Sequence, residues 1–240
     1  MKQLDVIIIG AGAAGLMCAI EAAKRRRNVF ILDHANKAGK KILMSGGGRC
    51  NFTNYTIEAD NYISHNPHFC KSALSRYTQW HFIELVEQYH IAFHEREHGQ
   101  LFCNDSSKDI LTMLLSEAKK YQVKIQLNTA INKISNKTDA VYIVETTREN
   151  YQCQSLVVAT GGLSIPKMGA TPLGYKIAEQ YNINIFPTSA GLVPFTLRSD
   201  DKKQFETLSG IAINSIVSTT HPYTGKVQFK ENILFTHRGL

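Results

Sequence analysis

The chain has 240 residues, of which 43% are hydrophobic, 20% charged and 9% aromatic, as is typical of globular proteins. This composition excludes collagen-like, low-complexity and disordered chains, and no apolar run approaches the ~18 residues of a membrane span. The 27 lysines and arginines outnumber 20 acidic residues, and the net charge of +7 favours anionic partners such as nucleotides, phosphates, nucleic acid or acidic lipid.

The N-terminal segment predicts a βαβ unit. Residues 4–9 form a β-branched run typical of a strand buried on both faces, which leads directly into a Gly-x-Gly-x-x-Gly turn at 10–15. Residues 16–27 have apolar side chains at helical spacing, and 29–32 predict a second strand that ends at Asp33. This order of elements is that of a dinucleotide-binding unit.

The following segments predict the rest of an α/β domain. Residues 34–65 are rich in Gly, Asn, Lys and Ser, and we expect a long functional loop there. Helices are expected over about 68–90, 106–121 and 174–181, and strands over 123–127, 140–146 and 156–159.

The pattern changes near residue 190 to short strands, which we expect at 192–197, 211–218 and 227–229, with a turn at 223–226. We therefore place a domain boundary near residue 188. Residues 1–188 are expected to form a Rossmann-like domain, and 189–240 to begin a β-rich domain.

Each glycine of the first turn has a mechanical role. Gly10 permits the tight turn out of the strand, Gly12 lets the backbone approach a diphosphate, and Gly15 lets helix and strand pack closely. The helix N-terminus offers N–H groups and a positive dipole end to phosphates. Asp33 can accept the ribose hydroxyl hydrogens. This pattern does not separate FAD from NAD.

The segment 39–54 favours FAD. Three consecutive glycines cost backbone entropy unless the backbone must pass close to a ligand. Cationic side chains suited to a diphosphate and polar side chains suited to a ring edge surround these glycines: Lys40, Lys41, Arg49, Asn51, Thr53 and Asn54. A flexible solvent-exposed loop is the alternative interpretation.

Four segments resemble the BaiN/YhiN-like family of bacterial flavoproteins, described as NAD(P)/FAD-dependent oxidoreductases or as FAD-binding members of the aminoacetone oxidase family. They are the glycine turn at 10–15, SGGGRCNFTN at 45–54, ATGG at 159–162 and GATPLGYKIA at 169–178. The resemblance covers essentially the whole chain. It implies an FAD domain of glutathione-reductase type, interrupted by a β-rich barrel domain and a small helical domain.

The resemblance also implies which residues hold FAD, with residues 129–131 passing the adenine and 45–54 running along the diphosphate toward the flavin. The expected cofactor-binding residues are Gly10, Gly12, Ala14, Gly15, Asp33, His34, Lys41, Ser45, Gly46, Gly47, Gly48, Arg49, Asn51, Thr53, Asn54, Ile131, Thr160 and Gly161. It identifies no catalytic acid or base.

Two segments depart from the family pattern. A family GRLFP motif is replaced by Gly-Gln-Leu-Phe-Cys at 99–103, and the chain stops inside a family LFTHxGxSGP motif at 235–240. We therefore expect an N-terminal portion of a longer protein, without the segment that returns to the FAD domain.

Residues 94–98, His-Glu-Arg-Glu-His, match the HExxH zinc-protease signature, in which His94 and His98 bind the metal and Glu95 is the base. Gly99 follows at once, the apolar alternation is that of a strand, and no third ligand stands at the usual spacing. We therefore expect a solvated charged segment and no metal, with a zinc hydrolase as a remote alternative.

Two further features have an ordinary and a functional interpretation. Cys50, beside Arg49, is either a reactive thiol or, as we favour, a packing residue. The Lys-Arg-Arg-Arg run at 24–27 either contacts RNA or, as we favour, complements the dipole at a solvated helix end.

We expect an FAD-dependent oxidoreductase that transfers hydride through the flavin, with NAD(P)H or O2 as the other partner and a small organic molecule as substrate. The five scattered cysteines, without a CxxC pair, fit a reducing bacterial cytoplasm. Neither nucleic acid nor a membrane is expected as a partner. A flavoprotein acting on RNA and a non-catalytic, truncated flavoprotein are the alternatives.

Overall fold

The computed structural model describes every residue except 1, 139, 192, 222–224 and 238. The chain forms two compact units, Met1–Ile185 and Phe186–Leu240. No helix among the described residues is long and apolar enough to cross a membrane.

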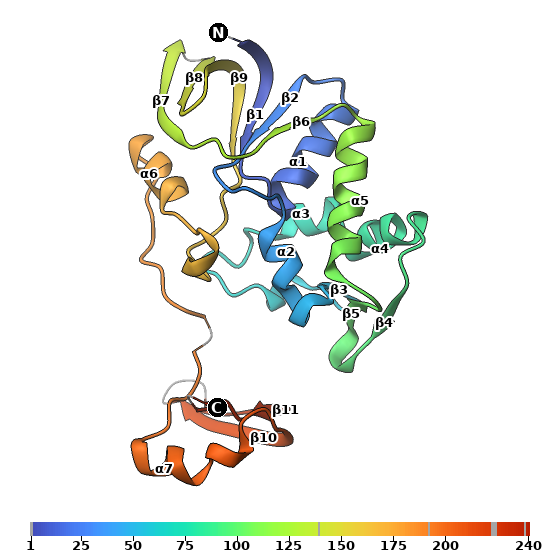
Figure 1. Cartoon of the computed structure of the whole chain (residues 1–240), viewed down its shortest axis with the longest axis vertical. Helices are drawn as coiled ribbons and strands as arrows, with labels where there is room; N and C mark the ends of the chain where they lie inside the picture. Colours follow the sequence, from blue (N-terminus) through green and yellow to red (C-terminus); the bar gives the residue numbers. More distant parts are fainter. Residues whose placement is uncertain (1, 139, 192, 222–224, 238) are drawn as a thin grey trace. The chain divides into compact units, whose positions relative to one another are not determined.

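The first unit is built on a six-stranded mixed sheet, which confirms the predicted α/β Rossmann-like class (Figure 1). Its strands lie in the order β6 (Lys124–Gln126), β2 (Val29–Leu32), β1 (Lys2–Ile9), β9 (Asn150–Val158), β8 (Val141–Thr146) and β7 (Ile131–Thr138). The first four are parallel, and β8 and β7 continue the sheet in antiparallel pairing. The sequence pattern predicted five of these strands but not β7, because its polar residues alternate at an exposed sheet edge and lack a continuous apolar signal.

The carboxyl ends of β1, β2 and β9 lie level with one another. Ile9 pairs with Leu32 on one side and with Val158 on the other. Because β1 leads to β2 on one side while β9 lies on the other, the crevice at the end of β1 is where a doubly wound sheet binds its ligand.

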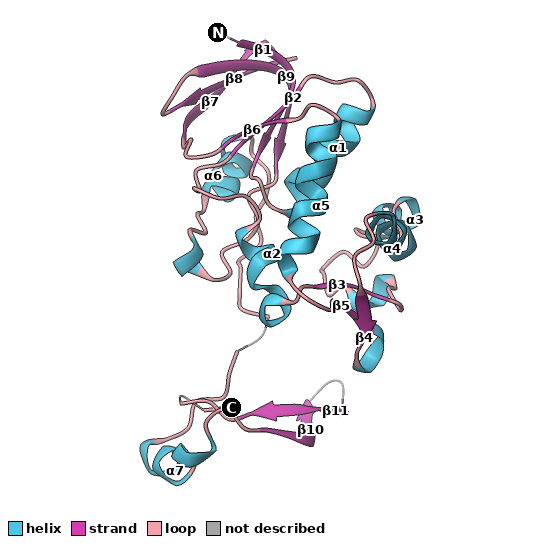
Figure 2. Cartoon of the chain, turned by 45° about the vertical axis from the view of Figure 1, so that its right-hand side comes forward, coloured by secondary structure: helices cyan, strands magenta, loops and turns pink. Residues whose placement is uncertain are grey.

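Both faces of β1 are buried, as the β-branched run predicted. On one face, Ile8 packs under Leu16 of α1 (Ala13–Lys24) and Met113 of α5 (Ser107–Lys120). On the other face, Ile7 packs with Tyr151 of β9. Figure 2 shows α1 and α5 side by side over this sheet.

The helix ends follow their local sequence. At the start of α5, the Ser106 side chain accepts a hydrogen bond from the Lys108 N–H at 3.1 Å, and the Asp109 side chain accepts one from the Ser106 N–H at 3.2 Å. This is a capping box, and it begins the helix where the sequence predicted. The predicted helices at 68–90 and 174–181 are also confirmed, as α3 (Lys71–Arg76), α4 (Gln79–Gln88) and α6 (Leu173–Gln180).

The expectation of a long loop over 34–65 is wrong. This segment contains α2 (Lys40–Met44), β3 (Asn51–Asn54) and 3₁₀ turns at Ser45–Gly48 and Ala59–Asn61. Strand β3 pairs with β5 (Gln100–Cys103), which pairs with β4 (Phe93–Glu95), in a separate antiparallel sheet. The reason is a distant contact, because the ring of Phe52 packs on those of Phe82 and Phe93, and composition alone does not reveal such contacts.

The second unit contains α7 (Ser199–Gln204) and a hairpin of β10 (Ala212–His221) and β11 (Gly225–Leu234). The strands predicted at 211–218 and 227–229 are confirmed and are longer than expected. The strand predicted at 192–197 is wrong over its described residues, where a single bridge joins Thr196 to Gly239. The predicted turn at 223–226 lies largely outside the described residues.

Replacing Gly15 with alanine is expected to destabilise the first unit. A Cβ atom there would lie 1.9 Å from the Gly10 carbonyl oxygen, so α1 would have to move away from β1. Overpacking of this kind costs about 1–3 kcal/mol of unfolding free energy, which chemical denaturation measures. Gly12→Ala is the matched control, since no atom lies within 4 Å of its Cβ position. Equal losses in the two variants would contradict this packing argument.

Candidate functional site

Two of the three glycines in the first turn are required by the packing of the protein itself. The Gly10 N–H donates to the Leu32 carbonyl at 2.8 Å, and a Cβ on Gly10 would lie 2.4 Å from the Ala159 carbonyl oxygen. Gly15 faces Gly10 in the same way. These two residues therefore bring β1, β2, β9 and α1 together at one edge of the sheet.

The third glycine faces open space. Gly12 is the N-cap of α1, no side chain caps the helix there, and no acidic residue stands in its first turn. Nothing lies within 4 Å of the position a Gly12 Cβ would take, and Ala13 and Ala14 are exposed. The first N–H groups of a helix have no intrahelical acceptor, so this end of α1 is suited to bind an anionic group.

The Asp33 carboxylate points back toward this turn. Its Oδ2 accepts a hydrogen bond from the Ala11 N–H at 2.7 Å, and its Oδ1 accepts one from the Ala35 N–H at 2.7 Å. A carboxylate has about four lone-pair positions, so acceptor capacity remains for ribose hydroxyls. The neighbouring His34 ring lies with Nε2 2.9 Å from the Gly169 carbonyl oxygen.

A cleft opens between these elements. The Thr129 N–H donates to the Asp33 carbonyl at 2.9 Å, which carries residues 129–131 past the end of β2. The cleft is lined by Ile9, Gly10, Leu32, Asp33, His34, Thr129, Ile131, Thr160, Thr171 and Leu173. The structure thus brings the predicted residues Gly10, Asp33, His34, Ile131 and Thr160 together.

Thr171 and Leu173 also line the cleft, although the sequence did not predict them as site residues. They lie at the start of α6, within the 169–178 segment on which the family resemblance partly rests. Gly174 explains how this helix comes so close, because a Cβ there would lie 2.4 Å from Thr160 Oγ1. The 169–178 segment was the signal in the sequence that could have indicated these residues. Its contact with the end of β9, however, depends on packing between residues far apart in the chain.

The glycine-rich run at 46–48 turns sharply after α2. All three glycines have positive φ angles, of 56°, 64° and 90°. A Cβ on Gly46 would lie 2.7 Å from the Asn51 nitrogen, whereas Gly47 and Gly48 face open space. The Ser45 hydroxyl donates to the Ile42 carbonyl at 2.7 Å, and Arg49 is exposed.

Lys41 joins α2 to the loop that follows β9. Its ammonium group donates to the Gly162 carbonyl at 2.9 Å and to Ser164 Oγ at 3.0 Å. It therefore holds the exposed Gly161, whose φ is +72°, beside α2. An ammonium has three donor hydrogens, so one remains for an anionic ligand.

The predicted residues Asn51, Thr53 and Asn54 line a different groove, along β3, rather than the cleft at the sheet edge. Its lining is Asn51, Phe52, Thr53, Asn54, Thr56, Ile57, Asn61, Tyr62 and His98. The Asn54 amide is engaged in the wall of this groove, because Nδ2 donates to the His98 carbonyl at 2.8 Å and Oδ1 accepts from the Thr56 N–H at 2.8 Å.

The HExxH segment does not form the helix that a zinc protease requires. His94 and Glu95 lie on β4, and His98 follows in a left-handed conformation with φ +61°. Both ring nitrogens of His94 have partners, at 2.7 Å from Asn104 Oδ1 and 3.3 Å from Arg96 Nε. This geometry agrees with the expectation of a strand and does not support the zinc hydrolase alternative.

Cys50 is buried in the core cluster that also contains Ile42 of α2 and Cys103 of β5. Burial raises the pKa of its thiol, although a hydrogen bond with Ser45 opposes this. Because the thiolate is the reactive form, a buried thiol with a raised pKa supports the packing role.

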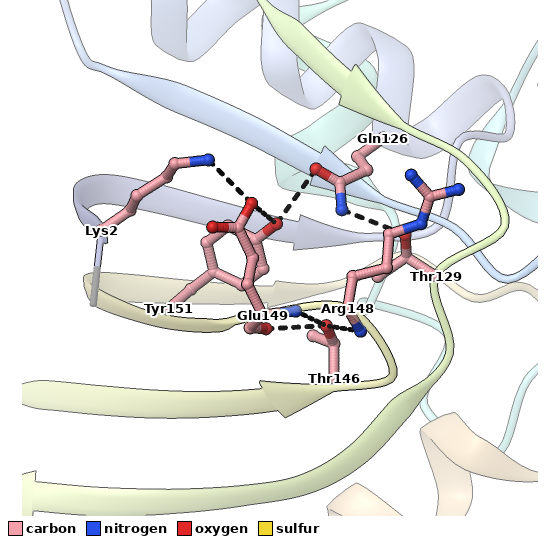
Figure 3. Close-up of polar contacts among 7 residues, drawn as sticks. All are labelled: Lys2, Gln126, Thr129, Thr146, Arg148, Glu149 and Tyr151. Atoms are coloured by element: carbon pink, nitrogen blue, oxygen red, sulfur yellow. Dashed lines mark hydrogen bonds and ion pairs between the residues drawn. The ribbon is translucent and has the colours of Figure 1, made fainter.

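A polar network reaches the cleft from the far end of β9 (Figure 3). The buried Tyr151 hydroxyl lies 3.0 Å from Gln126 Oε1 and 2.9 Å from Glu149 Oε1, and Lys2 pairs with Glu149 at 2.7 Å. Gln126 Nε2 then donates to Thr129 Oγ1 at 3.3 Å. The network therefore fixes Thr129 beside Asp33. Burial, followed by the hydrogen bond to Glu149, raises the pKa of Tyr151 to about 12.

Comparisons with known proteins agree with this geometry. A family model described as "HI0933-like protein Rossmann domain" matches residues 4–224. A curated protein named "Ribosomal RNA dihydrouridine synthase", from Escherichia coli (strain K12), is 49% identical over 240 residues, which are 100% of this chain and 59% of that protein. A "3-dehydro-bile acid delta(4,6)-reductase" from Clostridium scindens is 26% identical over 214 residues, 88% of this chain and 51% of that protein.

The chain therefore spans between half and three-fifths of the length of these two relatives. Among solved structures, the open conformation of a flavocytochrome c3 fumarate reductase superposes with a TM-score of 0.50 at 20% identity. The match covers 75% of this chain and 40% of that one. At this identity the likeness concerns the fold alone.

Replacing Tyr151 with phenylalanine is expected to destabilise the first unit by about 1–2 kcal/mol at neutral pH, because it removes a buried hydroxyl from two acceptors. The raised pKa means that the folded protein holds this proton more tightly than the unfolded chain. This contribution is therefore complete below pH ~10 and is lost as the pH rises toward 12. Urea unfolding at pH 8 and at pH 11 measures it. A difference between wild type and Tyr151→Phe that does not shrink at the higher pH would contradict this assignment.

Proposed function

We propose that this chain, which belongs to the HI0933-like Rossmann domain family, is a flavoprotein that binds FAD and reduces a carbon–carbon double bond of uridine in ribosomal RNA. The observation that carries the FAD proposal is the open N-terminus of α1 beside the Asp33 carboxylate. Packing explains Gly10 and Gly15, whereas the space in front of Gly12 is explained by a ligand.

The residues present fit FAD along one line. The N–H groups of Gly12–Ala14 would bind the diphosphate, and Asp33 would accept hydrogen bonds from the adenosine ribose. Ile131 would contact the adenine, and Thr160 would lie beside the cofactor where β9 ends. Lys41 is placed to neutralise a phosphate while it holds the 161–164 loop closed against α2.

When bound, FAD would supply two-electron chemistry, namely transfer of a hydride from a donor such as NAD(P)H to the substrate, with the accompanying proton taken from solvent. The chain's own residues bind and orient the reacting rings. The groove along β3 offers amides, hydroxyls and the aromatic residue Tyr62, a lining suited to a planar polar base. We propose that Asn51 and Thr53 lie between this groove and the flavin.

Two observations support RNA as the substrate. The relatives from Escherichia coli and Haemophilus influenzae, both 49% identical, carry the name "Ribosomal RNA dihydrouridine synthase". The chain also has a net charge of +7, which suits a polyanion. This proposal departs from our expectation that nucleic acid is not a partner, and it adopts the RNA alternative instead.

A second candidate function is reduction of a small-molecule double bond with the same cofactor. The relative from Clostridium scindens, at 26% identity, is named as a bile acid reductase, so the family model and this name together are compatible with a small organic substrate. NAD(P)H serves as donor in this proposal, and O2 is the alternative electron acceptor in the absence of substrate.

Gly12→Ala is expected to weaken FAD binding at least about tenfold while the fold remains, because the methyl group would occupy the space where the diphosphate approaches. Asp33→Asn is expected to weaken binding less, through loss of ribose hydrogen bonds. Flavin fluorescence titration of the purified apoprotein measures both affinities. Ala13→Gly is a control that leaves the approach open. Unchanged FAD affinity in Gly12→Ala would refute the proposal that the N-terminus of α1 binds the FAD diphosphate.

The purified protein, supplied with FAD and NADPH, is expected to convert uridine to dihydrouridine in a ribosomal RNA transcript. Mass spectrometry of the nucleosides detects the gain of two hydrogen atoms. A parallel reaction with an unsaturated steroid acid tests the second candidate. NADPH oxidation that yields reduced steroid and no dihydrouridine would overturn the RNA proposal and support the small-molecule one.

A further inference from the structure

The C-terminal ends of α1 and α5 meet at the ring of Tyr121, and we propose that the exposed basic residues on and just beyond these two helix ends bind the phosphate backbone of the RNA. We call these residues the α1–α5 basic surface, which consists of Lys24, Arg25, Arg26, Arg27, Lys119, Lys120 and Lys124. All seven side chains are on exposed residues. The inference rests on RNA as the substrate of the proposed function and adds the surface that holds it.

The two clusters meet around a single aromatic ring. The Lys24 ammonium lies 5.7 Å from the Tyr121 ring centroid, and the Lys120 ammonium lies 5.4 Å from it. Lys24 belongs to the last turn of α1, and Lys120 to the last turn of α5. The two helices lie side by side in both views of the fold (Figures 1 and 2). Charges that are far apart in the sequence are therefore adjacent on the surface.

Acidic neighbours neutralise only part of this charge. Glu21 pairs with Lys24 at 2.8 Å and Arg25 at 2.9 Å, and Glu117 pairs with Lys120 at 3.3 Å. Within the described part of the chain, no carboxylate forms an ion pair with the other four cations, which are Arg26, Arg27, Lys119 and Lys124. Their charge is free to interact with an anionic partner.

A solvated helix end does not account for this arrangement. The dipole at a helix C-terminus interacts with cations of the last turn only, and Arg26, Arg27 and Lys124 lie beyond the helices. Arginine guanidinium groups match phosphate oxygens bidentately, and lysines serve as point charges for the same groups.

The distance between this surface and the proposed FAD site favours a polymeric ligand over a single nucleotide. Helix α1 has 12 residues, so its basic end lies ~18 Å from the diphosphate cradle at its N-terminus. A single FAD molecule whose diphosphate binds at Gly12, as proposed, cannot also place that diphosphate against the basic C-terminal end of α1. An RNA strand carries a phosphate on every nucleotide and can contact this surface while one base enters a distant groove.

The test compares Arg27→Gln/Lys119→Gln with the matched control Lys133→Gln/Lys137→Gln. The control removes the same charge from exposed positions on β7, at the opposite edge of the sheet from β6. Fluorescence anisotropy measures binding of the FAD-loaded chain to a labelled oligouridylate over a range of salt concentrations. We expect the surface variant to bind ~10-fold more weakly and to lose about 0.7 from the salt slope for each removed contact. The control is expected to retain nearly wild-type binding.

Three results would overturn the proposal. The first is that the wild-type chain does not bind oligouridylate, and the second is that the surface variant and the control variant are weakened equally. The third is that the surface variant loses binding to phosphatidylserine vesicles but not to oligouridylate. Unchanged melting temperature and FAD content in both variants would show that the fold is intact. Failure of this proposal can be distinguished from failure of the proposed function. If the surface variant forms dihydrouridine as well as wild type does, only the role of the α1–α5 basic surface is refuted. If the chain binds RNA but reduces no uridine, only the proposed reaction is refuted.

Discussion

The pairing register of β1 with its two parallel neighbours is the constraint on which the site depends. Ile9 stands opposite both Leu32 and Val158, so the three strands end at one level and release their loops at one edge. A one-residue slip of β2 would turn Asp33 to the other face of the sheet. The hydrogen bond from the Ala11 N–H to Asp33 Oδ2, at 2.7 Å, then ties two of these loops together.

The glycines at this edge divide into two physical classes. Gly10, Gly15 and Gly174 let one piece of backbone approach another, and a methyl group at any of them would meet protein atoms within 2.4 Å or less. Gly12 and the pair Gly47 and Gly48 face open space, although the latter two also need their positive φ angles. Only Gly12 combines an ordinary φ with open space and a helix N-terminus, and so it is the glycine most specific to a ligand.

Helix α1 links the two proposed functions of the molecule. Its N-terminus presents free N–H groups to a diphosphate, and its C-terminus joins the end of α5 in a cationic surface. Both ends suit anions, but for different reasons. The first uses oriented backbone dipoles at close range, and the second uses side-chain charge that acts over a Debye length. A nucleotide cofactor and a nucleic acid can therefore be bound without competing for the same groups.

The amino-acid sequence by itself determined the local elements around the first turn. The β-branched run, the spacing of the three glycines and Asp33 after the second strand predict β1, α1, β2 and the cofactor edge, because burial, helical periodicity and turn geometry all act within about thirty residues. Only the tertiary structure decided that β7 is a strand, that residues 34–65 contain helix and strand, and that Asn51, Thr53 and Asn54 line a groove of their own. It also decided that Thr171 and Leu173 reach the cleft and that Lys24 and Lys120 share one ring. These features depend on contacts between residues far apart in the chain, where pairing and packing free energy outweigh local preference.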